Sequence, residues 1–174
     1  MSELAPGVAG ADRSTRFVDH VIHRCMQDKG LAARLRRADN PATEYQCWEL
    51  LLAFGIDLES EGQRLPYQTV AACIARAGVE HNGSQSLGGA LAACYGANSA
   101  PARARLHRLL ACDSVGELCR IVRAQVDLVA CKGGAPLDYR RLLRQLIRFG
   151  RDARRIKARW AREFYGHVAE EEAQ

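Results

Sequence analysis

Arginine residues in the C-terminal part of the sequence are spaced so that a helix would place them on one face. When residues 136–168 are plotted at about 100° per residue, the basic side chains separate from the apolar ones. The basic side consists of Arg140, Arg141, Arg144, Arg148, Arg151, Arg155, Arg159 and Arg162. A guanidinium group donates two parallel hydrogen bonds to the oxygens of a phosphate or carboxylate. The chemistry predicted for this row is therefore the binding of an anionic partner.

The charge of the chain is concentrated around this row. Residues 103–162 hold 16 Lys and Arg against 5 Asp and Glu, a formal charge of +11, whereas the other residues hold 9 against 15, a formal charge of −6. A solvated helix face usually mixes both signs, but only Asp138, Asp152 and Glu163 are near the arginines. The imbalance favours a phosphate-backbone surface. The alternative is a solvated face in a protein whose GC-rich genome favours arginine codons.

The opposite side of the same wheel is apolar and predicts a buried stripe. It consists of Tyr139, Leu142, Leu146, Phe149, Ala153, Ile156, Trp160 and Phe164. Because Trp160 and Phe164 point away from the charge, we interpret them as core residues and not as stacking platforms for bases. Gly150 leaves two possibilities, since glycine costs about 1 kcal/mol against alanine in a helix. Either one helix of about 34 Å spans residues 140–162, or two helices meet with their faces aligned.

Motifs for catalysis are scarce elsewhere. His20 and His23 lie at i and i+3 and could bind a metal with a third ligand, but an exposed polar helix face explains them better. The glycine-rich segment GSQSLGG lacks the Lys-Ser/Thr of a phosphate-binding loop, and GxSxG and HExxH are absent. The seven cysteines are odd in number and form no CxxC pair, which favours free buried thiols. We predict no enzyme, no metal site and no cofactor.

Helical periodicity runs through the chain, and no segment alternates with the period of a strand. Helices are expected over residues 14–29, 31–39 and 86–95, and Pro101 predicts the start of a helix that buries Leu106, Leu109 and Leu110. Asn40 and Pro41 predict a helix start, with Tyr45, Trp48, Leu51 and Leu52 buried behind it. Pro66 and Pro136 predict two further starts, and Ser114 with Glu117 forms a capping box for a helix through Val129.

The fold class predicted from this pattern is all-α, as two small packed helical bundles. The N-terminal helical lobe is expected at 14–80, a linker with a short helix at 81–100, and a C-terminal basic helical lobe at 101–168. No apolar run reaches the length of a membrane span, and the N-terminus lacks the pattern of a signal peptide. We therefore expect a cytoplasmic protein with no membrane partner.

Five segments of the sequence occur in an order and spacing that resemble a known family. They are ARLRRADNP (33–41), SLGGALA (86–92), RLHRLLACDSVGELCRIVRAQVDLV (105–129), LDYRRLLRQL (137–146) and ARWAREFY (158–165). Together they are similar to the small subunit of Cascade, the CasB family of type I-E CRISPR systems. Residues 42–80 match the family only as helices.

The resemblance implies an all-α protein without catalytic activity that serves antiviral defence. Its relatives lie as two copies in a crRNA-guided surveillance complex, beside its other subunits, and help to hold the displaced strand of the target DNA open in the R-loop. Guide pairing reads the sequence, so such a subunit needs contacts to the DNA backbone alone. The first candidate contacts are Arg140, Arg141, Arg144, Arg148, Arg151 and Arg155. The second set is Arg34, Arg36, Arg37, Arg103, Arg105, Arg108, Arg120 and Arg123. The alternative function is a protein-interaction scaffold whose arginine face docks acidic surfaces of its partners.

Overall fold

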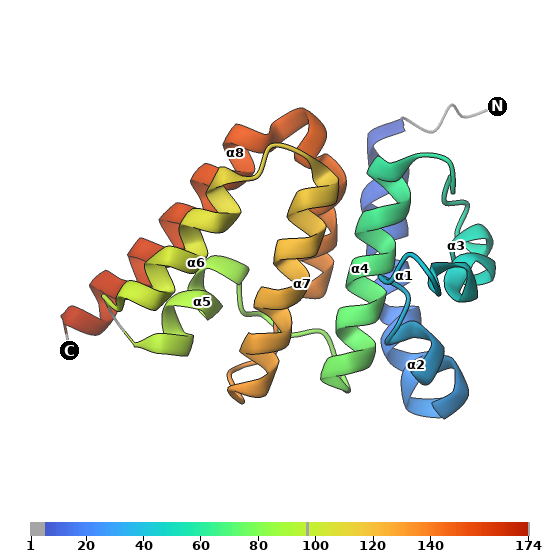
Figure 1. Cartoon of the computed structure of the whole chain (residues 1–174), viewed down its shortest axis with the longest axis horizontal. Helices are drawn as coiled ribbons and strands as arrows, with labels where there is room; N and C mark the ends of the chain where they lie inside the picture. Colours follow the sequence, from blue (N-terminus) through green and yellow to red (C-terminus); the bar gives the residue numbers. More distant parts are fainter. Residues whose placement is uncertain (1–5, 97, 174) are drawn as a thin grey trace.

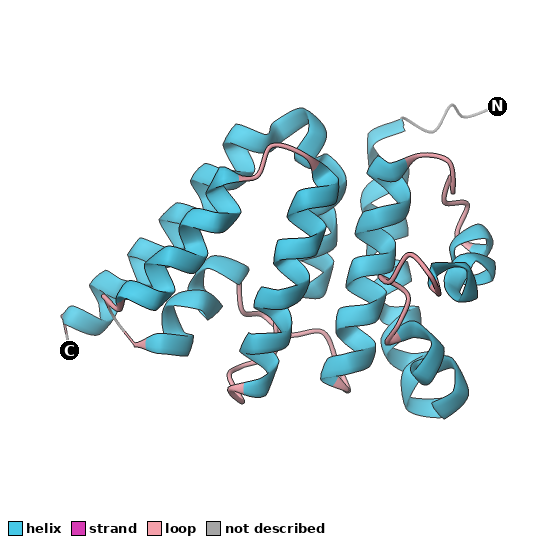
Figure 2. Cartoon of the chain, viewed as in Figure 1, coloured by secondary structure: helices cyan, strands magenta, loops and turns pink. Residues whose placement is uncertain are grey.

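The computed structural model describes residues 6–96 and 98–173, and these form helices joined by short loops (Figures 1 and 2). None of the described residues belongs to a strand, so the all-α prediction is confirmed. No helix in this part of the chain is both long and apolar enough to cross a bilayer. The elements are α1 (Pro6–Gln27), α2 (Lys29–Leu35), the 3-10 helix η1 (Glu44–Cys47), α3 (Trp48–Ala53), α4 (Glu61–Ala77), α5 (Leu87–Tyr95), α6 (Ala100–Ala111), α7 (Val115–Cys131) and α8 (Tyr139–Glu172).

One continuous apolar core connects the helices from Phe17 in α1 to Phe164 in α8. Helix α4 lies at its centre and packs against α1, α7 and α8. Residues 66–75 of α4 are buried throughout, so this helix contributes to stability mainly through the apolar surface that it buries against its neighbours. The division into lobes at 14–80 and 101–168 stays a prediction.

Helix starts that depend on a serine cap agree with the sequence analysis. The Ser114 hydroxyl accepts a hydrogen bond from the Glu117 amide at 3.2 Å, while the Glu117 carboxylate accepts one from the Asp113 amide at 3.3 Å. Ser86 caps α5 in the same way through the Gly89 amide. These side chains satisfy amides that have no partner within the helix.

The prediction of a helix that starts at Asn40 is wrong. The Asn40 side chain accepts a hydrogen bond from the Ala42 amide within a turn, and the chain then forms η1 before α3 begins. A 3-10 helix has three residues per turn, so its side chains fall out of line with those of the following α-helix. Tyr45 and Leu52, which were expected to be buried, are each 60% exposed.

Pro66 does not start a helix either, because α4 begins five residues earlier. Glu61 follows Ser60, whose backbone is extended, and supplies an acidic side chain to the first turn. An acidic side chain in the first turn is favourable, although the Ser60 side chain makes no capping hydrogen bond. Pro66 is accommodated inside the helix and is buried.

All seven cysteines carry free thiols, and four of them, Cys47, Cys73, Cys112 and Cys119, are buried as predicted. Cys25 and Cys94 are only partly buried, and Cys131 is exposed. Burial raises the pKa of Cys73 and Cys119 to about 12 and that of Cys47 to about 11. These thiols are therefore protonated at neutral pH. Because the thiolate is the reactive form, they act as small packing groups.

Arg76 joins three parts of the fold through a partly buried ionic cluster. Its guanidinium contacts Asp39 after α2 at 3.0 Å and Asp127 in α7 at 2.9 Å, and it also donates to the Arg36 carbonyl. The Asp39 side chain is only 7% exposed and also receives Arg123 at 3.3 Å. The cluster thus ties α2 and α7 to α4.

Replacing Arg76 by lysine is expected to lower the free energy of unfolding by about 1–2 kcal/mol. A single ammonium group cannot reach both carboxylates and the carbonyl in the fixed geometry of the guanidinium, so part of the buried charge loses its partner. Urea unfolding followed by circular dichroism measures the change. The control is Arg24→Lys, which alters an exposed pair with Asp28 and should cost less than about 0.5 kcal/mol. Equal losses in the two variants would contradict the role of Arg76.

Candidate nucleic-acid interface

Helix α8 carries the arginine row and bends sharply at Asp152. The backbone of this residue leaves the helical region, with φ −123° and ψ 25°. We call residues 139–151 the first arm and residues 153–172 the second arm; Figure 1 shows the second arm running back down toward the C-terminus. The row is therefore carried by two helical segments and not by one straight helix. Gly150 itself remains helical, so the break lies two residues beyond it.

Contacts between the arms show how closely they approach. The Trp160 indole Nε1 donates a hydrogen bond to the Gln145 Oε1 at 3.0 Å, and the Trp160 ring stacks on Phe149 with 6.5 Å between ring centroids. In a straight helix, Gln145 and Trp160 would be about 22 Å apart along the axis. An ion pair between Arg141 and Glu163 also joins the two arms, farther from the bend.

The loop before α5 positions the start of the first arm. The Gly83 amide donates to the Leu137 carbonyl at 3.0 Å, and the Asp138 amide donates to the Gln85 carbonyl at 2.9 Å. The Asn82 side chain donates to Asp138 and accepts from the Arg140 amide. Gly83 is required here, since a Cβ atom would lie 1.9 Å from the Pro136 carbonyl oxygen. This loop, which lies in the predicted linker, thus fixes the arginine row to the core.

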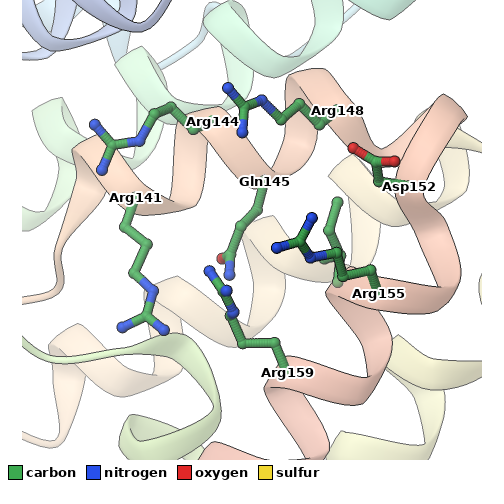
Figure 3. Close-up of a pocket in the computed structure, with 8 residues that line it drawn as sticks. Arg141, Arg144, Gln145, Arg148, Asp152, Arg155 and Arg159 are labelled. Carbon is green, nitrogen blue, oxygen red and sulfur yellow. The ribbon is translucent and has the colours of Figure 1, made fainter.

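A pocket of about 230 Å³ opens on the inner side of the bend (Figure 3). Side chains from both arms line it, and Figure 3 shows the arginines arranged around the Gln145 side chain. The lining consists of Arg141, Arg144, Gln145, Arg148, Asp152, Arg155, Ile156 and Arg159. Five guanidinium groups thus surround a space to which one carboxylate, that of Asp152, contributes.

The arginines of the row differ in how their charge is balanced. Arg140 pairs with Asp19 at 2.6 Å, and Arg141 pairs with Glu163. Among the described residues, no carboxylate lies within ion-pairing distance of the remaining pocket arginines; these are Arg144, Arg148, Arg155 and Arg159. Arg151 is exposed and lies outside the pocket lining. The bend therefore brings together four arginines that form no ion pair with a described carboxylate, in a pocket to which Asp152 contributes the one lining carboxylate. The net positive charge of this lining suits a phosphate or carboxylate group.

The second set of candidate arginines is divided among several surfaces. Arg105, Arg108 and Arg120 line a second depression of about 350 Å³ between α6 and α7, together with Glu117. Other members make contacts within the chain: Arg36 donates to the Ala75 carbonyl, Arg103 to Asn98, Arg105 to Gln125, and Arg123 pairs with Asp39. Arg34 and Arg37 are exposed near the end of α2.

The apolar stripe of α8 is buried as predicted. Trp160 is 0% and Phe164 1% exposed, so their interpretation as core residues is confirmed. Ala153 is partly buried and packs against the core, whereas Tyr165 is 46% exposed.

The histidine pair in α1 has ordinary surroundings. His20 packs edge-on against Phe54, with 5.2 Å between ring centroids, and burial lowers its pKa. In the described part of the chain, no three His, Cys, Asp or Glu side chains are grouped so that they could hold a metal.

Besides Asp152 and Ile156, the pocket lining contains two residues with hydrogen-bond donors that were absent from the candidate contacts, Gln145 and Arg159. Arg159 lay on the predicted basic face, and Gln145 was not considered. Both belong to a series with helical spacing, at positions 141, 145, 148, 152, 155 and 159. The sequence signal that could have identified Gln145 as a pocket residue was a neutral amide in this series of mostly basic residues.

Comparison with known proteins identifies the family of the chain. The family model described as CRISPR-associated protein Cse2 matches residues 31–165. No curated protein matches the chain. Among solved structures, a Cse2-family protein from Thermus thermophilus is 29% identical with a TM-score of 0.71, over 88% of this chain and 97% of that one. CasB from M. ruber is 27% identical with a TM-score of 0.76, over 92% and 97%.

A chain of a CRISPR RNA-guided surveillance complex has the same fold. It has a TM-score of 0.73 at 19% identity, over 91% of this chain and 95% of that one. The family match spans all five segments on which the resemblance rested, together with all but the last residues of α8, and it confirms that resemblance. The chain belongs to the Cse2, or CasB, family of CRISPR-associated proteins.

Proposed function

We propose that this protein is a non-catalytic, nucleic-acid-binding subunit of a crRNA-guided CRISPR surveillance complex. In this proposal it stabilises the target-bound R-loop by contacting the DNA backbone, including that of the displaced strand. The observation that carries the proposal is the convergence of Arg144, Arg148, Arg155 and Arg159 on one pocket, where no carboxylate of the described residues forms an ion pair with any of them. Membership of the Cse2 family and the shared fold with a chain of a surveillance complex support it.

The arrangement suits contacts that do not depend on sequence. Guanidinium groups bind phosphate oxygens, and contacts to phosphates position a strand without distinguishing its bases. In a guide-directed complex the base pairing supplies the specificity. The four aromatic rings of the stripe, those of Tyr139, Phe149, Trp160 and Phe164, are buried and cannot serve as stacking platforms for bases. In this proposal, electrostatic contacts are the main source of affinity.

Titration of the isolated protein with single-stranded and double-stranded DNA at several salt concentrations tests the proposal. If the four pocket arginines each contact a phosphate of a single strand, the logarithm of the affinity should fall with the logarithm of salt with a slope of about −3. A fourfold rise in salt should then weaken binding about 50-fold. Absence of binding at low salt, or binding that ignores salt, would contradict the proposal.

A further inference from the structure

One polar group in the α8 bend lacks a partner in the structure. The Gln145 side-chain Nε2 is buried and, in the described part of the chain, has no hydrogen-bond acceptor. Gln145 as a whole is 8% exposed, yet it lines the pocket between the two arms. Figure 3 shows its side chain pointing away from the first arm, toward the space between Arg141 and Arg159.

The orientation of this amide is fixed by Trp160. The indole Nε1 can only donate a hydrogen bond, so the atom that it contacts at 3.0 Å must be the amide oxygen of Gln145. Because Trp160 is fully buried and stacks on Phe149, the oxygen has little freedom to move. The NH₂ group is therefore held on the opposite side of Cδ from the oxygen, as a donor without an acceptor among the described residues.

The surroundings define the acceptor that would fit. Arg144, Arg148, Arg155 and Arg159 bring four positive charges to the same pocket, so an anionic oxygen is favoured over a neutral one. A buried donor without an acceptor costs free energy, and an oxygen of an anion bound among the arginines would remove that cost. The pocket of about 230 Å³ is large enough for a phosphate group.

We infer that the α8 bend is a seat for one phosphate of the bound strand, in which the Gln145 NH₂ group donates a hydrogen bond to an oxygen of that phosphate while the pocket arginines contact this phosphate and its neighbours along the strand. This inference rests on the proposed function, because it assigns one phosphate of the bound strand to one place. The pocket arginines supply the attraction, and Gln145 supplies a directed contact that fixes the register of the strand. An ordered water at Nε2 is the alternative occupant.

Gln145→Glu tests the inference with little change of shape. A glutamate can still accept the hydrogen bond from Trp160, but it presents an oxygen where the NH₂ group was. The control is Arg154→Gln, which also lowers the net charge by one; Arg154 is exposed on the same helix and does not line the pocket. We expect affinity for oligo-dT to fall at least about 10-fold in Gln145→Glu and less than about twofold in Arg154→Gln. Equal losses would overturn the inference.

A second measurement does not depend on how well the variant folds. The side-chain NH₂ resonances of Gln145 in the ¹H–¹⁵N spectrum of the wild-type protein, assigned with Gln145→Met, should shift when oligo-dT is added. An abasic deoxyribose-phosphate strand should produce the same shift, because the acceptor is a phosphate. Resonances that stay in place, as expected for a bound water, would overturn the inference, as would a response that requires the bases.

The outcomes separate this inference from the proposed function. Salt-dependent binding of DNA in which the Gln145 resonances do not move would overturn the phosphate seat and leave the proposed function supported. If the wild-type protein binds no DNA at low salt, both are overturned.

Discussion

Reversing the charges of Arg144 and Arg148 to glutamate is expected to weaken binding of single-stranded DNA at least about 100-fold at low salt. Both side chains belong to the first arm of α8 and line the pocket, and no described carboxylate pairs with either of them. Reversal removes two phosphate contacts and adds two repulsive charges, and a 100-fold loss corresponds to about 2.7 kcal/mol. The slope of the salt dependence should also become shallower by about 1.4.

A control with the same change of charge distinguishes the pocket from the overall field of the protein. Lys29→Glu combined with Arg154→Glu lowers the net charge by the same amount, at two exposed positions that do not line the pocket. Long-range attraction alone would weaken both double variants equally. We expect the control to lose less than about fivefold. Fluorescence anisotropy of labelled oligo-dT measures both affinities.

The same variant tests the scaffold hypothesis. If the arginine face docks acidic protein surfaces, Arg144→Glu with Arg148→Glu should prevent assembly of the surveillance complex and leave DNA binding by the free protein unchanged. The proposed function expects the reverse, with assembly preserved and retention of target DNA reduced. Size-exclusion chromatography of the reconstituted complex, followed by DNA binding, distinguishes the two results.

The local pattern of α8 could be predicted because it depends on helical period alone. Residues three and four apart lie on the same face whatever the rest of the chain does. Tyr139, Phe149 and Trp160 are accordingly buried, whereas Arg148 and Arg155 are exposed. Serine caps were predictable for a similar reason, since each depends on residues within one turn.

The bend at Asp152 could not be predicted from the wheel. The apolar stripe keeps its phase on both sides of the break, so a straight helix and two arms folded together give the same pattern. The contacts that accompany the bend, such as those of Trp160 with Gln145 and of Arg141 with Glu163, join residues 15 and 22 positions apart. Gly150 was the residue suspected on helix propensity, yet tertiary contacts placed the break elsewhere.

The segment that forms η1 and α3 was predicted less well than α8, because its structure does not follow from helical period alone. Tyr45 and Leu52 were assigned to a buried face because one α-helix was assumed where the chain forms a turn and a 3-10 helix. That the candidate arginines contact DNA stays a prediction. Their assembly into a pocket could not be predicted, because it depends on the bend at Asp152. The sequence could indicate which residues share a helix face. It could not indicate that the bend folds the two halves of this face toward one another.

The second arm of α8 is held in place by close packing on α5, and Gly88 makes this packing possible. A Cβ atom at Gly88 would lie 2.4 Å from the Trp160 carbonyl oxygen and 2.9 Å from the Glu163 Cβ. Neither contact can be relieved by moving the end of a flexible side chain. The first glycine of SLGGALA, one of the segments that carried the family resemblance, thus has a packing reason.

Gly88→Ala is therefore expected to lower the free energy of unfolding by about 3 kcal/mol, at the upper end of the range for overpacking, and the melting temperature by about 6–12 °C. The matched control is Gly150→Ala in α8, where no atom lies within 4 Å of the added Cβ. This substitution should raise stability by about 0.5–1 kcal/mol, because it removes the entropic cost of a glycine inside a helix. Thermal unfolding followed by circular dichroism measures both.

Opposite signs of the change in unfolding free energy for Gly88→Ala and Gly150→Ala would show that α5 and α8 lie too close together for a side chain at position 88. If Gly88→Ala were as stable as the wild-type protein, α5 would have room to move and the second arm would not depend on it. In the expected case, the variant should also lose affinity for DNA at temperatures where it remains folded. The added methyl group pushes against the backbone at Trp160, and Trp160 sets the orientation of Gln145 in the pocket.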